Sequence, residues 1–198
     1  LLAGLIQTTL FSLDKLFLLN IYSIEDLGIY GFSSIPLTMG IVMSGILATF
    51  FTPKILHEFG SKEDLLQAFR HSRNISLIVI LAGITLYPIY YLIIDFVINN
   101  LFPDYLESKE LMAIFYMPAL FIAANLFGPF LMAAKKFSFF IYYEFSLLFC
   151  AGVMYSLIIW GNLEIIFFPY TLTAISTGGF IFLFFYSRRL AYNNLASK

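Results

Sequence analysis

The sequence predicts an all-α polytopic membrane protein, and three observations support this prediction. Of the 198 residues, 61% are hydrophobic and only 12% are charged. A soluble domain carries about 25% charged residues and could not bury this much apolar surface. Apolar runs recur at the length of about 20 residues that a helix needs to cross a bilayer, and the polar breaks between them alternate in charge.

Six membrane-spanning helices are expected from these runs. They lie near residues 1–21, 27–55, 74–98, 111–134, 140–160 and 165–186. Residues 1–198 therefore form a single six-helix transmembrane domain. Because the chain begins inside an apolar run, without Met and without the charged start of a signal peptide, we expect it to be a segment of a longer protein.

The charges in the breaks predict how the helices are oriented. Nine cations share one side: Lys54, Lys62, Arg70, Arg73, Lys135, Lys136, Arg188, Arg189 and Lys198. The breaks on the other side, residues 23–26, 103–110 and 162–164, are acidic and have Lys109 as their only cation. Short cytoplasmic loops accumulate Lys and Arg, so both ends of the chain are predicted to be cytoplasmic.

The break after the second span, residues 61–73, has the pattern of a short helix. Ser61 is followed three residues later by Asp64, as in a capping box, and a short apolar stripe that includes Phe69 comes next. The pattern fits either a surface helix at the cytoplasmic interface or a solvated connector.

Motifs for enzymatic chemistry and for cofactors are not found. His57 and His71 have no cysteine or carboxylate at metal-ligand spacing, and no glycine-rich phosphate loop occurs. The basic residues are accounted for by topology, so we expect no nucleic-acid partner. Cys150 is the single cysteine and cannot form an intrachain disulfide. We therefore expect a protein that is not an enzyme and that uses no cofactor or metal.

Two charged residues at membrane depth are the strongest functional signal. Asp14 and Lys15 lie in the middle of the first apolar run, where each charge costs about 2.5–3.5 kcal/mol. Neighbours in sequence point about 100° apart around a helix, so a direct pair between the two side chains is not expected. Asp14 is predicted to face a cavity or a partner. Lys15 either faces a cavity or extends its side chain outward to the interface.

Two further polar residues are candidates for the same interior. Asn125 lies deep in the fourth span, where it faces a cavity or makes a hydrogen bond between helices. Glu144 lies near the cytoplasmic start of the fifth span, so it reaches either the interface or the interior. We take Lys15, Asp14, Asn125 and Glu144 as the candidate substrate-binding residues.

Proline and glycine residues predict bent and closely packed helices. Pro36, Pro88, Pro118, Pro129 and Pro169 fall within predicted spans, and the pair Gly178 and Gly179 is expected to loosen the last span. Gly40, Ser44 and Ala48 recur every four residues, which favours a close contact between helices. Bent helices suit a bundle with an interior cleft.

Several short motifs together resemble a known family. They are residues 12–19 (SLDKLFLL), 27–30 (LGIY), 52–54 (TPK), 101–105 (LFPDY) and 134–136 (AKK). In order and spacing they resemble the C-terminal half of the polysaccharide flippase branch of the multidrug/oligosaccharidyl-lipid/polysaccharide exporter superfamily. The motifs are short, but together they extend over most of the chain.

The resemblance implies a fold and a function. It implies one six-helix bundle of a two-bundle transporter, with an N-terminal helix bundle as its partner, in the cytoplasmic (inner) membrane of a bacterium. The implied substrate is an O-antigen or capsule-type oligosaccharide on polyprenyl pyrophosphate, exported by alternating access among membrane lipids. Lys15 would then attract the anionic head group, and Asp14 would tune the cavity charge or bind a coupling cation or proton.

Three other functions compete with this interpretation. A drug or cation antiporter of the same superfamily would share the fold but would rely on buried carboxylates. A membrane enzyme acting on lipid-linked sugars would need a cluster of polar residues in a loop, and the outer loops are short. A structural subunit would use Asp14 and Lys15 for contacts between helices.

Overall fold

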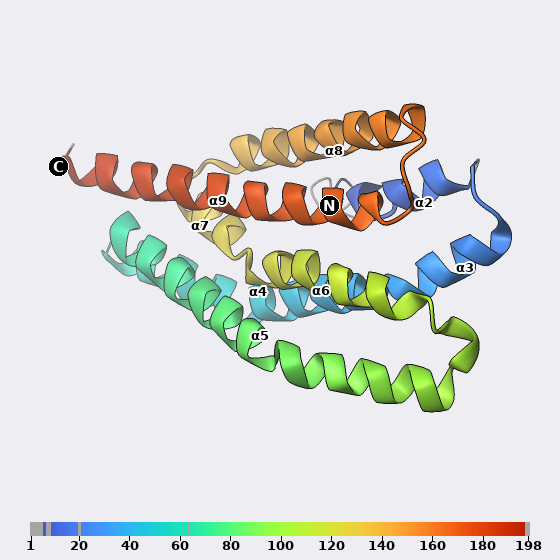
Figure 1. The fold of residues 1–198 in the computed structure, drawn as a ribbon. Coiled ribbons are helices and arrows are strands. Elements are labelled where there is room, and N and C mark those ends of the chain that lie inside the picture. Colours follow the sequence, from blue (N-terminus) through green and yellow to red (C-terminus); the bar gives the residue numbers. More distant parts are fainter. Residues whose placement is uncertain (1–5, 7–8, 20, 63, 197–198) are drawn as a thin grey trace.

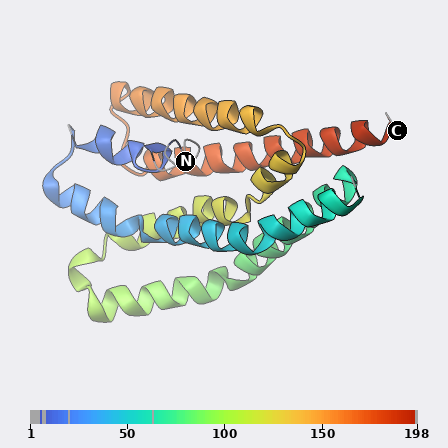
Figure 2. The ribbon, with the colours of Figure 1, turned by 180° about the vertical axis from the view of Figure 1, so that it is seen from behind.

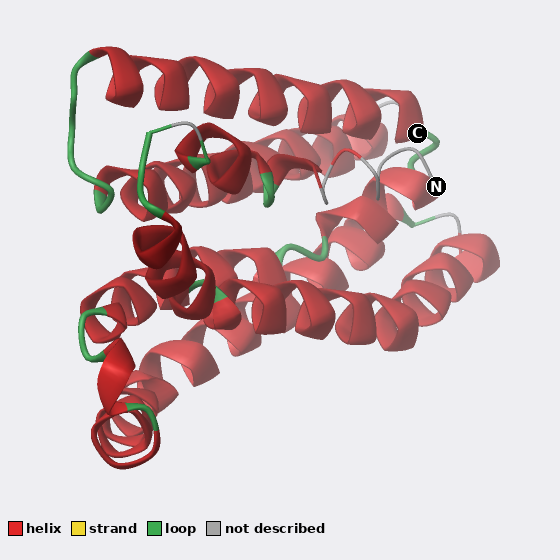
Figure 3. Ribbon diagram, turned by 90° about the vertical axis from the view of Figure 1, so that its right-hand side faces the viewer, coloured by secondary structure: helices red, strands yellow, loops and turns green. Residues whose placement is uncertain are grey.

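The structure is a computed structural model that describes residues 6, 9–19, 21–62 and 64–196, with side chains for all of these except 58–62 and 194–196. Its helices are α2 (Leu13–Leu18), α3 (Ile24–Ser33), α4 (Ile35–Lys62), α5 (Leu65–Leu101), α6 (Ser108–Ala124), α7 (Phe127–Ala133), α8 (Phe137–Trp160) and α9 (Phe167–Ala196), with a short 3-10 helix, η1, at Pro103–Tyr105. The described residues contain no strand (Figure 3). The predicted all-α fold class is confirmed.

Five helical segments of the described chain are long and apolar enough to cross a membrane. They are Ile24–His57, Leu65–Leu101, Ser108–Ala133, Phe137–Trp160 and Phe167–Asn193. They match the second to sixth predicted spans, and most of their ends lie within a few residues of the predicted ones. The chain is thus a multi-pass membrane protein by helix length and hydropathy.

The first predicted span lies partly outside the described residues, which omit 1–5, 7–8 and 20. Where it is described, it is not one continuous helix. Phe11 and Ser12 form a turn, and α2 then covers only Leu13–Leu18. The prediction of one uninterrupted helix over residues 1–21 is therefore wrong for the described part.

The connector predicted at residues 61–73 is also different in the structure. Helix α4 extends to Lys62, so residue 61 lies within α4, and the side chain of Asp64 caps the next helix. Its Oδ1 accepts hydrogen bonds from the backbone N–H groups of Leu66 (2.9 Å) and Gln67 (3.2 Å), two donors that a helix start leaves unpaired. Residues 65–73 are thus the first turns of α5, which is too long to lie wholly within a bilayer core of about 30 Å.

The prolines differ in their effect because they occupy different helix positions. Pro36, Pro129 and Pro169 lie in the first turns of α4, α7 and α9, where the missing N–H has no intrahelical partner to lose. Pro88 and Pro118 lie inside α5 and α6, where each removes a hydrogen bond. Helix α5 is visibly bent part-way along its length (Figure 1). The expected loosening at Gly178 and Gly179 is not seen, since α9 continues through both.

Helix α6 forms the centre of the bundle. It packs against α3, α4, α5 and α9, and its span is the most buried of the five. Helices α8 and α9 lie side by side along one side of the bundle, and α4 and α5 form the other (Figures 1 and 2). Gly40 allows α4 to approach α6 closely, because a Cβ there would lie 2.6 Å from the backbone oxygen of Ala119. The close contact predicted at Gly40 is confirmed.

The connections between helices lie at two opposite ends of the bundle. The α4–α5 and α7–α8 connections and the C-terminus lie toward one end, and the α2–α3, α5–α6 and α8–α9 connections lie at the other (Figure 1). The basic and acidic breaks of the sequence therefore occupy opposite ends. At the acidic end Lys109 forms a salt bridge with Asp95, which also accepts a hydrogen bond from Asn99.

A tyrosine ties the N-terminal segment to the acidic end. The hydroxyl of Tyr22 donates a hydrogen bond of 3.1 Å to the carbonyl of Leu163 in the α8–α9 connection. Partial burial, together with the nearby charges of Asp26 and Glu164, raises the pKa of Tyr22. The hydroxyl therefore keeps its proton and stays a donor at neutral pH. This bond holds the end of α2 against the loop that joins the last two spans.

Candidate functional site

The carboxylate of Asp14 is enclosed by the bundle. Its side chain is fully buried, and the hydroxyl of Tyr30 in α3 donates a hydrogen bond of 2.6 Å to Oδ2. The backbone N–H of Lys15 donates a second, of 2.8 Å, to Oδ1. Both carboxylate oxygens therefore have a donor, as a buried charge requires. The structure places Asp14 against a protein partner and not on an open surface.

A second tyrosine completes this cluster. Tyr155 of α8 is fully buried, and its hydroxyl has no hydrogen-bond partner among the described residues. Its ring stacks with Phe168, with ring centroids 5.0 Å apart, and the ring of Tyr30 meets Phe115 edge to face. The three polar groups of Asp14, Tyr30 and Tyr155 thus lie within an apolar core, where the hydrogen bond between Tyr30 and Asp14 is strong because water is excluded.

Lys15 lies on a different face of α2. Ser12, Leu16 and Leu19 are exposed and Lys15 is half-buried, whereas Asp14 and Leu18 are buried. Ser12, Leu16 and Leu19 are three or four residues apart, the spacing at which residues share one face of a helix. Within the described residues the ammonium of Lys15 forms no hydrogen bond and no salt bridge. Residues that follow one another on a helix point in different directions, which explains why Asp14 is buried and Lys15 is not. Lys15 is thereby left available to a partner outside this bundle.

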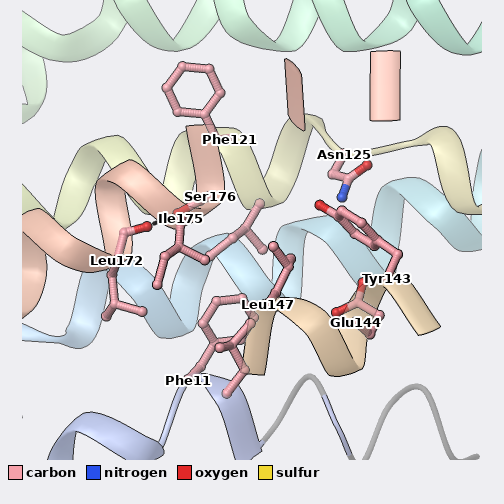
Figure 4. A pocket seen from close by; sticks show the side chains of 11 residues that line it. Phe11, Phe121, Asn125, Tyr143, Glu144, Leu147, Leu172, Ile175 and Ser176 are labelled. Atoms are coloured by element: carbon pink, nitrogen blue, oxygen red, sulfur yellow. Dashed lines mark hydrogen bonds between the residues drawn. The ribbon is translucent and has the colours of Figure 1, made fainter. Parts of the chain in front are cut away.

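Asn125 and Glu144 line one and the same cavity. It measures about 30 Å³ and is enclosed by the N-terminal segment, α6, α8 and α9; its polar lining residues are Asn125, Tyr143, Glu144 and Ser176 (Figure 4). A volume of this size holds one or two water molecules. The two residues, 19 positions apart, are brought together because α6 ends at the cavity and α8 passes beside it.

The cavity is lined by both donors and acceptors: Tyr143 and the amide of Asn125 carry O–H or N–H groups, whereas an ionised Glu144 can only accept. Glu144 is only 4% exposed and has neither a hydrogen bond nor a salt bridge among the described residues. Oδ1 of Asn125 is buried without a partner. The hydroxyl hydrogen of Ser176 is used on the carbonyl of Leu172. Glu144 therefore does not reach the interface, although it lies only about 10 Å into α8 at 1.5 Å per residue.

A glycine on α9 makes room for the third polar side chain of the cavity. A Cβ at Gly179 would lie 2.3 Å from the hydroxyl of Tyr143. This hydroxyl and the amide of Asn125 point toward one another in Figure 4. Gly179, which the sequence suggested as a loose point in the helix, instead admits a tyrosine hydroxyl to the interior.

Sequence reasoning missed the residues that surround the four candidates. Tyr30 and Tyr155 lie in largely apolar runs, and Tyr143 and Ser176 each have a polar neighbour in sequence, patterns that many interfacial tyrosines and serines share. Tyr30 is 16 residues from Asp14, and only tertiary packing brings the two together. Tyr143 adjoins Glu144 in sequence, and this was the one available signal.

No protein-family model, no curated protein and no solved structure matches this chain. The helix lengths, the hydropathy and the packing establish a multi-pass helical membrane protein with two groups of polar residues in its interior.

Proposed function

We propose that the chain is one helix bundle of a transporter that moves a lipid-linked oligosaccharide across the cytoplasmic (inner) membrane of a bacterium. The substrate is an O-antigen or capsule-type repeat unit on polyprenyl pyrophosphate, and transport is by alternating access against a second, N-terminal helix bundle. The motifs listed above support this family, and the proposal includes no enzymatic step.

The observation that carries the proposal is that the half-buried side chain of Lys15 has no hydrogen bond or salt bridge among the described residues. A cation in a predicted span is costly without a partner, and the described bundle supplies none. Lys15 is half-buried and lies beside the exposed residues Ser12, Leu16 and Leu19 of this segment, where a second bundle or a substrate would meet it. A pyrophosphate group would give this ammonium charge-assisted hydrogen bonds. Lys15 is therefore assigned to the anionic head group.

We infer a different role for Asp14. Its two oxygens accept hydrogen bonds from Tyr30 and from the backbone of Lys15, and its side chain is fully buried, so it presents no exposed surface to a ligand. Through the backbone N–H of Lys15 and the hydroxyl of Tyr30, Asp14 joins α2 to α3. Asp14 is accordingly a positioning residue that supports the site from inside the bundle.

Replacing Lys15 with Ala will lower export of the lipid-linked oligosaccharide roughly tenfold or more, since a charge-assisted hydrogen bond contributes about 1.5–3 kcal/mol. Export is measured in cells as polymer at the surface, normalised to protein in the membrane. Lys15→Arg should keep most of the activity because the charge persists. Lys109→Ala is the matched control, because the salt bridge of Lys109 with Asp95 is at the outer end and partly exposed. Wild-type export in Lys15→Ala would contradict the assignment.

A drug or cation antiporter is the second candidate, and Glu144 is the observation that favours it. A carboxylate with no partner beside a cavity is the kind of group that binds a cationic substrate. Competition between lipid-linked oligosaccharide export and cationic dyes separates the two functions. Dye efflux that depends on Glu144 but not on Lys15 would favour the antiporter.

A further inference from the structure

We propose that helices α8 and α9 bind an anionic phospholipid of the bilayer at the basic end of the bundle. Its phosphate lies against Lys136 and Arg189, and its acyl chains lie along the aromatic rings next to them. The α8–α9 lipid surface is made of Lys136, Phe139, Phe182, Tyr186 and Arg189. It is a binding site for a membrane lipid, and it does not depend on which substrate the protein transports.

The first argument is a stack of aromatic rings that fixes how α8 and α9 are aligned. The ring of Phe139 in α8 stacks on that of Tyr186 in α9, with centroids 3.9 Å apart and planes at 12°. Four residues further along α8, Tyr143 stacks with Phe182 of α9 at 6.0 Å. Residue numbers rise along α8 and fall along α9 from one pair to the next, so the two helices are antiparallel and each pair is about 6 Å from the other.

The second argument is that the same alignment places a cation from each helix at the end of this stack. Lys136 precedes Phe139 by three residues and Arg189 follows Tyr186 by three, a spacing at which residues share one helix face. Both cations therefore lie beyond the Phe139 and Tyr186 pair, toward the basic end of the bundle (Figure 1). Both side chains are exposed. Topology explains why cations gather at this end, but not why two of them continue a column of stacked rings.

The third argument is that these two cations have no carboxylate partner. Within the described residues neither Lys136 nor Arg189 forms a salt bridge or a side-chain hydrogen bond. In the α4–α5 and α7–α8 connections at this end, Asp64 is the one carboxylate whose side chain is described, and it caps α5. The guanidinium of Arg189 matches two oxygens of a phosphate, and the ammonium of Lys136 adds a compact charge. An anionic phosphate is therefore the ligand that fits this pair.

The position of the rings identifies the anion as a lipid. Phe139 belongs to the apolar segment Phe137–Trp160, and Phe182 and Tyr186 belong to Phe167–Asn193, both long enough to cross a membrane. Phe182 is 52% exposed, so its ring is in contact with acyl chains. A ligand of this surface has to combine an anionic group at the end of the spans with an apolar chain beside the rings. A phospholipid of net negative charge has both, whereas a soluble phosphate has only the first.

The lipid surface is distinct from the site proposed at Lys15. Helix α2, which carries Lys15, approaches α8 at Gly152, where a Cβ would lie 3.9 Å from Cδ2 of Leu13. Gly152 follows Lys136 by 16 residues, which is about 24 Å along a helix at 1.5 Å per residue. A phosphate bound by Lys136 is therefore too far away to be shared with Lys15, and the two cations serve different ligands.

Native mass spectrometry of the purified full-length protein, with phosphatidylglycerol or phosphatidylcholine added at equal concentration, tests the proposal. The wild-type protein should retain more phosphatidylglycerol, because only this lipid carries a net negative charge. Replacing Lys136 and Arg189 together with Gln should weaken phosphatidylglycerol binding roughly thirtyfold, the equivalent of about 1 kcal/mol for each cation. Binding of phosphatidylcholine should be the same in both proteins.

Lys54→Gln combined with Arg70→Gln is the matched control. It removes the same charge at the same end of the bundle, from exposed positions on α4 and α5, which lie on the other side from α8 and α9 (Figures 1 and 2). This control should bind phosphatidylglycerol as the wild type does. Equal losses in the two double variants would show a general effect of charge, and no loss on replacing Lys136 and Arg189 would remove the site. Either result would overturn the proposal.

Two further measurements identify the ligand. Glycerol phosphate has the phosphate without acyl chains, so it should not displace phosphatidylglycerol at equal concentration; displacement would assign the surface to a soluble anion. Lys15→Ala should bind phosphatidylglycerol as the wild type does, whether or not it exports a substrate. A loss as large as that of the Lys136 and Arg189 double variant would place the lipid at the site of Lys15 and contradict a separate lipid surface.

Discussion

Replacing Tyr30 with Phe will destabilise the bundle by about 3 kcal/mol, because it leaves one oxygen of a buried carboxylate without its donor. The hydroxyl of Tyr30 lies 2.6 Å from Oδ2 of Asp14, and both side chains are fully buried. The substitution removes one oxygen atom and keeps the aromatic ring, including its edge-to-face contact with Phe115. The lost free energy therefore reports the hydrogen bond and not the packing.

The free energy of unfolding in mixed micelles measures this effect. Tyr155→Phe is the matched control, because Tyr155 is equally buried and its hydroxyl has no partner in the described structure. Removing an unsatisfied hydroxyl should be neutral or slightly stabilising. In a double-mutant cycle, Asp14→Leu with Tyr30→Phe should cost less than the sum of the two single changes. Equal losses in Tyr30→Phe and Tyr155→Phe would contradict the role given to Tyr30.

Replacing Gly40 with Ala will also destabilise the bundle, by about 1–3 kcal/mol as for other overpacked sites. The added Cβ would lie 2.6 Å from the oxygen, 2.7 Å from Cα and 2.8 Å from Cβ of Ala119. Two of these three atoms are backbone, so no side-chain rotation relieves the overlap. Helices α4 and α6 would have to move apart along the central contact of the bundle.

Gly45→Ala is the matched control on the same helix. A Cβ at Gly45 meets nothing within 4 Å, so this change should be neutral or stabilising by up to about 1 kcal/mol through helix propensity. The midpoint of thermal unfolding in detergent is the measurement for both variants. Similar midpoints for Gly40→Ala and Gly45→Ala would show that α4 and α6 do not make this contact.

The long spans could be predicted because the bilayer imposes a length and a polarity on any helix that crosses it. The same rule could not locate the interruptions at Ser34 and at Asn125, because it considers the length and polarity of a segment and not its local backbone hydrogen bonds. It also failed at residues 61–73. There the polar residues belong to a helix that begins before the predicted membrane segment. Asp64 is itself the N-cap of that helix, whereas the sequence pattern placed it three residues after a cap at Ser61.

The sequence predicts the charged residues of the candidate site but not the residues that contact them. The cost of burying charge identifies Asp14, Lys15 and Glu144 from sequence alone. Whether each has a partner depends on residues far away in the chain. Tyr30 supplies a donor to Asp14, whereas no described residue does so for Glu144. For this reason two carboxylates that look alike in sequence have different surroundings in the structure.

Transport by proteoliposomes tests the central claim most directly. Liposomes carrying the purified full-length protein are loaded with a polyprenyl-pyrophosphate-linked oligosaccharide, and the sugar that reaches the opposite leaflet is measured by its accessibility to an added glycosidase. The account predicts faster transfer than in protein-free liposomes, and a return to the protein-free rate with Lys15→Ala. Equal transfer with and without the wild-type protein would contradict it.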